Sequence, residues 1–284
     1  MSTTDALDSP HASEVDRGER FEFGENWRRF LSVLNDERIA EAERSLREML
    51  GVQDLRGKTF VDVGSGSGLF SLAAARLGAD RVHSFDFDPS SVGCAQELHR
   101  RSGAGADWTI ELGSALDADY LGRLGTFDVV YSWGVLHHTG DMWRAMANVE
   151  ALVAPAGWLF ISIYNDQGLR SRIWRIVKRG YNRLPEALRG PYAVLVMGPR
   201  ELLSLAYATA RLRPWNYVHA WTQYRRRRGM SRWHDIVDWV GGYPFEVAAP
   251  DAVFNFWRER GFALERLVTR QGLGCNEFVF RRAP

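Results

Sequence analysis

Short apolar runs alternate with segments of helical periodicity through the middle of the chain. The run TFVDV at 59–63 is apolar and leads into a glycine-rich turn, which is typical of a strand buried on both faces of a sheet. Further strands are expected at 81–86, 107–111, 127–132 and 157–164, with helices at 67–78, 89–102 and 141–153. Regular alternation of strand and helix predicts a parallel sheet that is covered by helices on both faces.

The alternation stops at Asn165, where a helical stretch rich in basic and aromatic residues begins and continues to residue 235. This stretch contains no clear strand and is interrupted by Pro185, Pro191, Pro199 and Pro214. We interpret it as a lid inserted into the core, which resumes with a helix at 250–260 and strands at 263–269 and 275–281. The expected fold class is therefore α/β, a doubly wound and mostly parallel seven-stranded sheet with a helical lid insertion.

The two ends of the chain complete the expected organisation. The first 20 residues are polar with little to bury, which favours a disordered tail over 1–20. Helical spacing of apolar residues predicts a helix from Asn26 to Met49. The expected segments are thus the tail, a core over 21–164, the lid over 165–248 and a closing core segment over 249–284.

The net charge of +1 conceals a strong local imbalance. Residues 165–235 carry 15 Lys and Arg against four acids, so this stretch is +11 and the remainder of the 284-residue chain is −10. Such a field can guide an anionic ligand, although a charge run can also do no more than solvate a surface. The polar N-terminus is unlike a secretory signal, and no run reaches the ~18 apolar residues of a spanning helix, so a cytoplasmic location is expected.

Glycines at 64, 66 and 68 fall between the first strand and the next helix. Small residues there let the backbone turn sharply and approach a ligand. The spacing is G-x-G-x-G with Leu69 following, whereas the dinucleotide fingerprint is G-x-G-x-x-G, so a pyrophosphate fits poorly. Asp86 ends the second strand about 20 residues after the loop, where a carboxylate can take both hydroxyls of a ribose. The two features predict a site for a nucleoside that lacks phosphate.

Four segments, VDVGSGSG, FDFDPSSV, FDVVYSWGVLHHTGD and VAPAGWLFISIY, occur in this order. In order and spacing they resemble the motifs of class I S-adenosylmethionine-dependent methyltransferases, over about 55–165 and again from about 250. The turn Trp-Gly-Val-Leu-His-His is similar to the small-molecule subgroup that includes ubiquinone-biosynthesis O-methyltransferases. The resemblance implies a Rossmann-like methyltransferase core and S-adenosyl-L-methionine as methyl donor.

The resemblance also implies which residues hold the donor. The loop glycines Gly64, Gly66 and Gly68 pass under its methionine part, and Asp86 holds its ribose. Asp62 orders the loop or meets the amino group, and Phe87 flanks the adenine. The family often has an aspartate after the third strand; here the sequence is Gly-Ser-Ala-Leu, so Ser114, with Ala115 beside it, is expected to meet the adenine.

Candidate chemistry lies in the turn after the fourth strand, because strand carboxyl ends line the ligand crevice of this fold. Methyl transfer requires an aligned acceptor and, where the acceptor carries a proton, a base. His137 and His138 are the candidate bases, since histidine titrates near neutrality, with His138 preferred. Alternatively, both histidines only pack or contact backbone or donor.

Trp133, in the same turn, is expected to stack on donor or acceptor. No metal site is expected, because the histidines do not cluster with carboxylates at ligand spacing.

The acceptor site is expected where the lid meets the core. Candidate contacts are Tyr164 and Asn165 after the fifth strand, and Tyr243 and Glu246 before the last helix. Because the lid is both basic and apolar, we expect a small acidic or lipid-like acceptor, methylated on oxygen or carbon, and peripheral contact with a membrane is compatible with it. Two alternatives remain: an RNA methyltransferase, suggested by Arg225–Arg228 but disfavoured by the acidic remainder, and a donor-binding protein without turnover.

Overall fold

The structure is a computed structural model that describes residues 10–24, 27, 31, 34–103, 107–222 and 232–284. Its centre is one seven-stranded sheet in the order β3-β2-β1-β4-β5-β7-β6. The strands β1 to β5 run parallel, and β7 is antiparallel to both of its neighbours. The strand bounds are β1 Thr59–Val63, β2 Arg81–Asp86, β3 Asp107–Leu112, β4 Phe127–Trp133, β5 Val153–Tyr164, β6 Phe262–Val268 and β7 Cys275–Arg282. The expected fold class is therefore confirmed.

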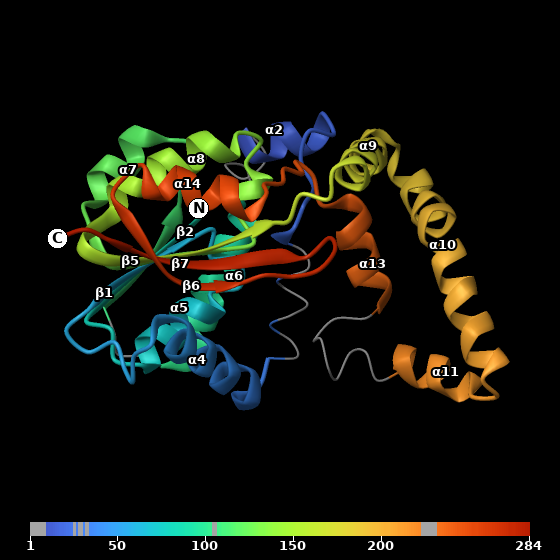
Figure 1. Cartoon of the computed structure of the whole chain (residues 1–284), viewed down its shortest axis with the longest axis horizontal. Coiled ribbons are helices and arrows are strands. Elements are labelled where there is room, and N and C mark those ends of the chain that lie inside the picture. Colours follow the sequence, from blue (N-terminus) through green and yellow to red (C-terminus); the bar gives the residue numbers. More distant parts are fainter. Residues whose placement is uncertain (1–9, 25–26, 28–30, 32–33, 104–106, 223–231) are drawn as a thin grey trace.

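Helices cover both faces of this sheet (Figure 1). One layer consists of α4 (Asp36–Leu50), α5 (Leu69–Arg76) and α6 (Pro89–Ser102), and the other of α7 (Ala118–Leu124), α8 (Met142–Val149) and α14 (Pro250–Arg258). Each layer buries its own apolar cluster, with Leu46, Leu72 and Leu98 on the first face and Leu121, Met146 and Trp257 on the second. The strands are thus apolar on both sides, as the uninterrupted runs in the sequence require.

The lid is a helical arm that extends beyond the end of the sheet (Figure 1). It consists of α9 (Leu169–Arg183), α10 (Glu186–Ala210), α11 (Pro214–Thr222) and α13 (Arg232–Gly241). A separate cluster that includes Tyr181, Met197 and Val240 holds α9, α10 and α13 together. The prolines at 191 and 199 do not end a helix, since α10 continues through both.

The structure corrects three details of the expected element pattern. The predicted disorder over 1–20 is wrong from Pro10 onward, because Pro10–Asp16 forms α2 and His11 is buried. The helix expected from Asn26 to Met49 starts in the sequence at a residue outside the described ones, and the described helix α4 begins at Asp36, where Asn35 is in extended conformation and caps it through its side chain. The helix expected over 141–153 ends at Val149, and a 3-10 turn, Glu150–Leu152, leads into the longer β5.

Candidate active site

The glycine loop between β1 and α5 adopts a backbone that only glycine accepts readily. Gly64, Gly66 and Gly68 have φ values of 76°, 53° and 78°, all in the left-handed region. A Cβ on Gly64 would lie 2.3 Å from a methyl carbon of Val135, in the turn after β4. The loop therefore lies directly against the segment that carries the candidate catalytic residues, and a side chain at Gly64 would force the two apart.

Asp86 lies at the carboxyl end of β2 and secures the same loop. Its Oδ2 accepts the backbone N–H of Gly66 at 2.9 Å, and its Oδ1 accepts that of Asp88 at 2.9 Å. Burial raises the pKa of Asp86 to about 6, although both hydrogen bonds oppose the rise. Each carboxylate oxygen has taken one donor and keeps a free lone pair, so the group can accept two further hydrogen bonds.

Asp62, near the end of β1, is buried beside Asp86. Its Oδ2 accepts the hydroxyl of Ser71 at 2.6 Å, and that serine in turn accepts the hydroxyl of Ser84 at 2.7 Å. Burial raises the pKa of Asp62 to about 7, and the charge of Asp86 adds to the rise. The carboxyl group of Asp62 is thus fixed by Ser71 of α5, and it lines the large cavity described next.

A cavity of about 1590 Å³ opens at this end of the sheet. Its walls include ten of the fifteen residues that the sequence singles out: Asp62, Gly64, Gly66, Asp86, Phe87, Ser114, Ala115, Trp133, His138 and Tyr164. Pockets for one small ligand typically measure ~300–1,000 Å³, so this cavity has room for a donor and an acceptor together. It runs from the carboxylates and the glycine loop at one end to the turn after β4 and the lid at the other.

The two adjacent histidines in the turn after β4 have different surroundings. His138 lines the cavity, and its Nδ1 lies 2.5 Å from the backbone oxygen of Pro244. Because a carbonyl only accepts, Nδ1 carries the proton and Nε2 keeps its lone pair. Burial lowers the pKa of His138 to about 3, so the ring is neutral at pH 7. His137 is fully buried outside the cavity wall and packs on Tyr164, with ring centroids 4.2 Å apart.

Four other predicted residues also lie outside the wall of this cavity. Gly68 precedes α5 and packs against Ala95. The side-chain amide of Asn165 donates to the backbone oxygens of Arg270 and Gly272, and so fixes the loop before β7. Tyr243 and Glu246 border a second cavity of about 390 Å³. The carboxylate of Glu246 accepts the N–H of Met142 at 3.1 Å and thereby caps α8.

A family model described as a methyltransferase domain matches residues 34–237, which is more than half of the chain. The chain belongs to this methyltransferase family. The predicted resemblance to class I S-adenosylmethionine-dependent methyltransferases is thereby confirmed, and with it the expected methyl donor of the family.

Curated relatives of this chain include ubiquinone biosynthesis O-methyltransferases. The protein of Paraburkholderia xenovorans is 32% identical over 157 residues, and that of Burkholderia cenocepacia is 31% identical over the same length. The match covers 55% of this chain and 65% of each relative, slightly less than two thirds of their length.

Solved structures show the same fold as this chain. One is magnesium protoporphyrin IX methyltransferase from Synechocystis with bound S-adenosylhomocysteine, at 16% identity and a TM-score of 0.53, covering 99% of this chain and all of that one. Another is a protein named PKMT2 from Rickettsia typhi, in complex with the same compound, at 12% identity and a TM-score of 0.54, covering 85% of this chain and 52% of that one.

Sequence reasoning missed the contribution of the N-terminal segment to the large cavity. His11, Glu14, Arg20, Phe21 and Phe23 all line the large cavity. Phe23 packs on the ring of His138, with centroids 5.1 Å apart. The signal that could have found this segment is the pair of phenylalanines, because two large apolar side chains close to a polar tail need something to pack against.

The lid contributes to both cavities. Met197, Arg200 and Trp239 reach the large cavity, and Arg270 reaches it from the loop after β6. The arginines at 175, 179 and 183 border the second cavity instead. Arg225–Arg228, which suggested RNA, lie outside the described residues. Within the described part of the chain, no group of three or more His, Cys, Asp or Glu is placed to hold a metal, and no helix is long and apolar enough to cross a membrane.

Proposed function

We propose that this chain transfers the methyl group of S-adenosyl-L-methionine to an oxygen or carbon of a small, acidic or amphipathic acceptor. The observation that carries the proposal is that one cavity, the large one described above, joins two kinds of group. A carboxylate suited to a ribose lies at one end of it, and a neutral histidine with a free lone pair lies at the other.

The residues at the donor end fit the donor. Asp86 offers two free acceptor positions for the ribose hydroxyls, and Asp62 offers a buried carboxyl group for the amino group. Phe87, Ser114 and Ala115 surround the place expected for the adenine, and the hydroxyl of Ser114 already accepts the N–H of Leu116 at 3.2 Å. The donor supplies a methyl group on a positively charged sulfur, which leaves as a neutral thioether.

His138 would accept the proton that the acceptor loses. The backbone oxygen of Pro244 holds the Nδ1–H, so the ring is fixed in the tautomer whose Nε2 is basic. Burial keeps the ring uncharged at neutral pH, which leaves Nε2 without a proton, but a pKa of about 3 also makes the ring a weaker base. The assignment therefore rests on the tautomer of His138 and on its place in the cavity wall. The fully buried His137 is better suited to supporting Tyr164 than to acting as a base.

The wall of the acceptor end supports an amphipathic acceptor. Phe21, Met197 and Trp239 make it apolar, and it carries charges of both signs, from Arg200, Arg232 and Arg270 and from Glu201, Asp235, Asp238 and Glu277. The curated relatives are named as O-methyltransferases, which favours oxygen over carbon.

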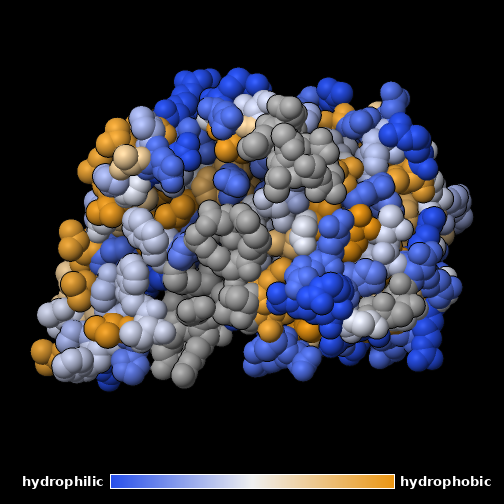
Figure 2. All heavy atoms as spheres, turned by 180° about the vertical axis from the view of Figure 1, so that it is seen from behind, coloured by the Kyte–Doolittle hydropathy of each residue, from blue (hydrophilic) through white to orange (hydrophobic). Residues whose placement is uncertain are grey.

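The outer face of the lid arm favours a lipid-like acceptor or peripheral contact with a membrane. Large apolar side chains are exposed along it, and they contribute to the apolar areas at the left edge of Figure 2. They are Leu169, Ile173, Ile176, Leu188, Val194, Leu195, Leu202, Leu203, Tyr207, Trp215 and Val218. Isolated exposed apolar residues are ordinary, but eleven such large side chains on one basic arm are typical of surfaces that meet an amphipathic partner.

The test is formation of S-adenosylhomocysteine by the purified chain with a panel of phenols, carbon acids and RNA. Turnover with a phenol is expected, and His138→Gln is expected to lower kcat by ~10²–10⁴, the usual contribution of a general base. The matched control is His219→Gln on the exposed surface of α11. Turnover with RNA alone would contradict the proposed acceptor, and donor binding without turnover on any acceptor would favour a binding protein.

A further inference from the structure

The segment Pro10–Gly24 crosses the large cavity between its two ends. Near the donor end, the N–H of Gly24 donates to Asp88 Oδ2 at 2.7 Å, and the ring of His11 lies edge-on to that of Phe87 at 5.7 Å. At the other end, the N–H of Phe21 donates to the backbone oxygen of Tyr243 at 2.8 Å. The segment, whose residues 10–20 sequence composition assigns to a disordered tail, is therefore attached to both halves of the site.

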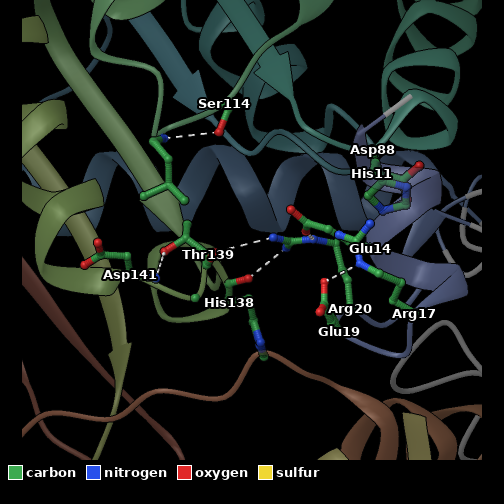
Figure 3. A network of polar contacts seen from close by, with 12 residues as sticks. His11, Glu14, Arg17, Glu19, Arg20, Asp88, Ser114, His138, Thr139 and Asp141 are labelled. Atoms are coloured by element: carbon green, nitrogen blue, oxygen red, sulfur yellow. Dashed lines mark hydrogen bonds and ion pairs between the residues drawn. The ribbon is translucent and has the colours of Figure 1, made fainter. Parts of the chain in front are cut away.

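Arg20 is the residue of this segment that contacts both halves through one side chain. Figure 3 shows its guanidinium between helix α2 and the turn after β4. Its Nε donates to Glu14 at 2.6 Å, its Nη1 to the backbone oxygen of His138 at 2.9 Å, and its Nη2 points to that of Thr139 at 3.4 Å. The guanidinium carbon also lies 4.9 Å from the centre of the Phe87 ring. The side chain is only 13% exposed.

The turn that carries His138 needs such a partner. It is a three-residue 3-10 helix, Leu136–His138, and the last carbonyls of a helix find no N–H donor within that helix. The guanidinium donates to the last carbonyl of this helix, that of His138, and points to the carbonyl of the C-cap residue Thr139. On the opposite side, the ring of His138 is held by the backbone oxygen of Pro244. His138 is thus fixed through its backbone by the N-terminal segment and through its ring by the segment that follows the lid.

We propose that Arg20 is a positioning residue, which ties the donor-end wall at Phe87 to the turn of His138 so that donor and base are held in one geometry. The inference rests on the proposed function, because it assigns Phe87 to the donor end and His138 to the base. The planar fork of an arginine is required, since Glu14 and two carbonyls are contacted in three directions from one group. A lysine at this position restores the charge but cannot span the three partners.

The chain provides a matched control in Arg17. This residue lies on the same segment and forms an ion pair with Glu19, with N–O distance 2.8 Å, but its side chain is 58% exposed and it is not part of the cavity wall. A general effect of losing charge from the segment is therefore expected in Arg17→Gln as well, whereas a positioning effect is specific to Arg20→Gln and Arg20→Lys.

The first experiment is calorimetric titration of S-adenosylhomocysteine into the wild type, Arg20→Gln, Arg20→Lys and Arg17→Gln, with thermal melting of each variant. The expected result is a dissociation constant raised about tenfold in both Arg20 variants, no rescue by lysine, and a value within twofold of wild type for Arg17→Gln. Equal affinity in all four proteins would overturn the proposal, as would full rescue by lysine or an equal loss in Arg17→Gln.

The second experiment observes His138 directly. Two-bond ¹H–¹⁵N spectra of the histidine rings, assigned with His138→Gln, report the tautomer in the complex with S-adenosylhomocysteine. A single Nδ1–H tautomer is expected in the wild type and in Arg17→Gln, and a mixture or broadened signal in Arg20→Gln. An unchanged His138 signal in a folded Arg20→Gln variant would contradict positioning. If the wild type binds no S-adenosylhomocysteine, the proposed function fails. If the wild type binds it and the Arg20 variants behave as the wild type does, only the inference about Arg20 fails.

Discussion

Replacing Asp86 with asparagine should separate donor affinity from the stability of the fold. The wild-type carboxylate accepts two backbone N–H groups and, in the proposed complex, two ribose hydroxyls. Asparagine has the same shape but only one acceptor atom, so at least one hydrogen bond to a charged group is lost. Such a bond contributes ~1.5–3 kcal/mol, which corresponds to a ~10- to 150-fold higher dissociation constant for the donor.

The same substitution should cost the fold comparatively little. Burial raises the pKa of Asp86 to about 6, so the carboxylate is ionised at pH 7 but carries a desolvation penalty. A neutral amide avoids this penalty, which offsets the loss of one of the two backbone N–H bonds, since the amide oxygen can accept only one of them. Urea denaturation of Asp86→Asn is therefore expected to give a free energy of unfolding close to that of the wild type.

The assay is calorimetric titration of S-adenosylhomocysteine, with Asp128→Asn as the matched control. Asp128 also accepts a backbone N–H, from Thr59 at 2.9 Å, but it is not part of the cavity wall. Its substitution should leave the dissociation constant within about twofold of wild type, well below the loss of one charged hydrogen bond. If Asp86→Asn binds as tightly as wild type, the ribose is held elsewhere and the reading of the glycine loop as the donor site is refuted.

Three further outcomes are expected. Because the pKa of Asp86 is raised to about 6, donor affinity should fall as the pH is lowered through 6 and the carboxylate gains a proton, and calorimetry at pH 5–8 should show no such step at this pH in Asp86→Asn. Gly64→Ala should lose more unfolding free energy than Gly134→Ala in urea titrations, since both have similar φ (76° and 78°) but only the first Cβ meets Val135. Arg200→Glu should raise the acceptor KM without changing donor affinity, whereas Arg179→Glu, outside the large cavity, should change neither in steady-state kinetics.

The grouping of the proposed donor residues could be predicted from sequence because it follows from the geometry of the sheet. Parallel strands end at the same edge, so residues that follow β1, β2 and β4 must meet there even though they are far apart in the chain. Asp86 and Gly66 are 20 residues apart and share a hydrogen bond for this reason. The prediction needed only the strand ends, and these are marked by apolar runs and glycines.

Side-chain direction could not be predicted in the same way. Tyr164 and Asn165 are neighbours at the end of β5, yet only Tyr164 reaches the cavity, because successive residues of an extended chain point to opposite sides. Glu246 lies in the segment that meets the lid, but the free N–H groups at the start of α8 attract its carboxylate. Proximity in sequence to a ligand-binding loop placed these residues near the site without indicating which way they face.

The N-terminal segment shows a different gap between sequence and structure. Its order comes from contacts with distant residues: Gly24 is bonded to Asp88, 64 positions away, and Arg20 to His138, 118 positions away. Local composition cannot register such contacts, because each one exists only after the core has placed its partner. The acceptor end of the cavity has the same origin, since Phe23, Tyr164 and Trp239 come from three separate parts of the chain. Under the proposed function, acceptor choice can therefore change by substitutions in these segments while the strand ends proposed to hold the donor stay as they are.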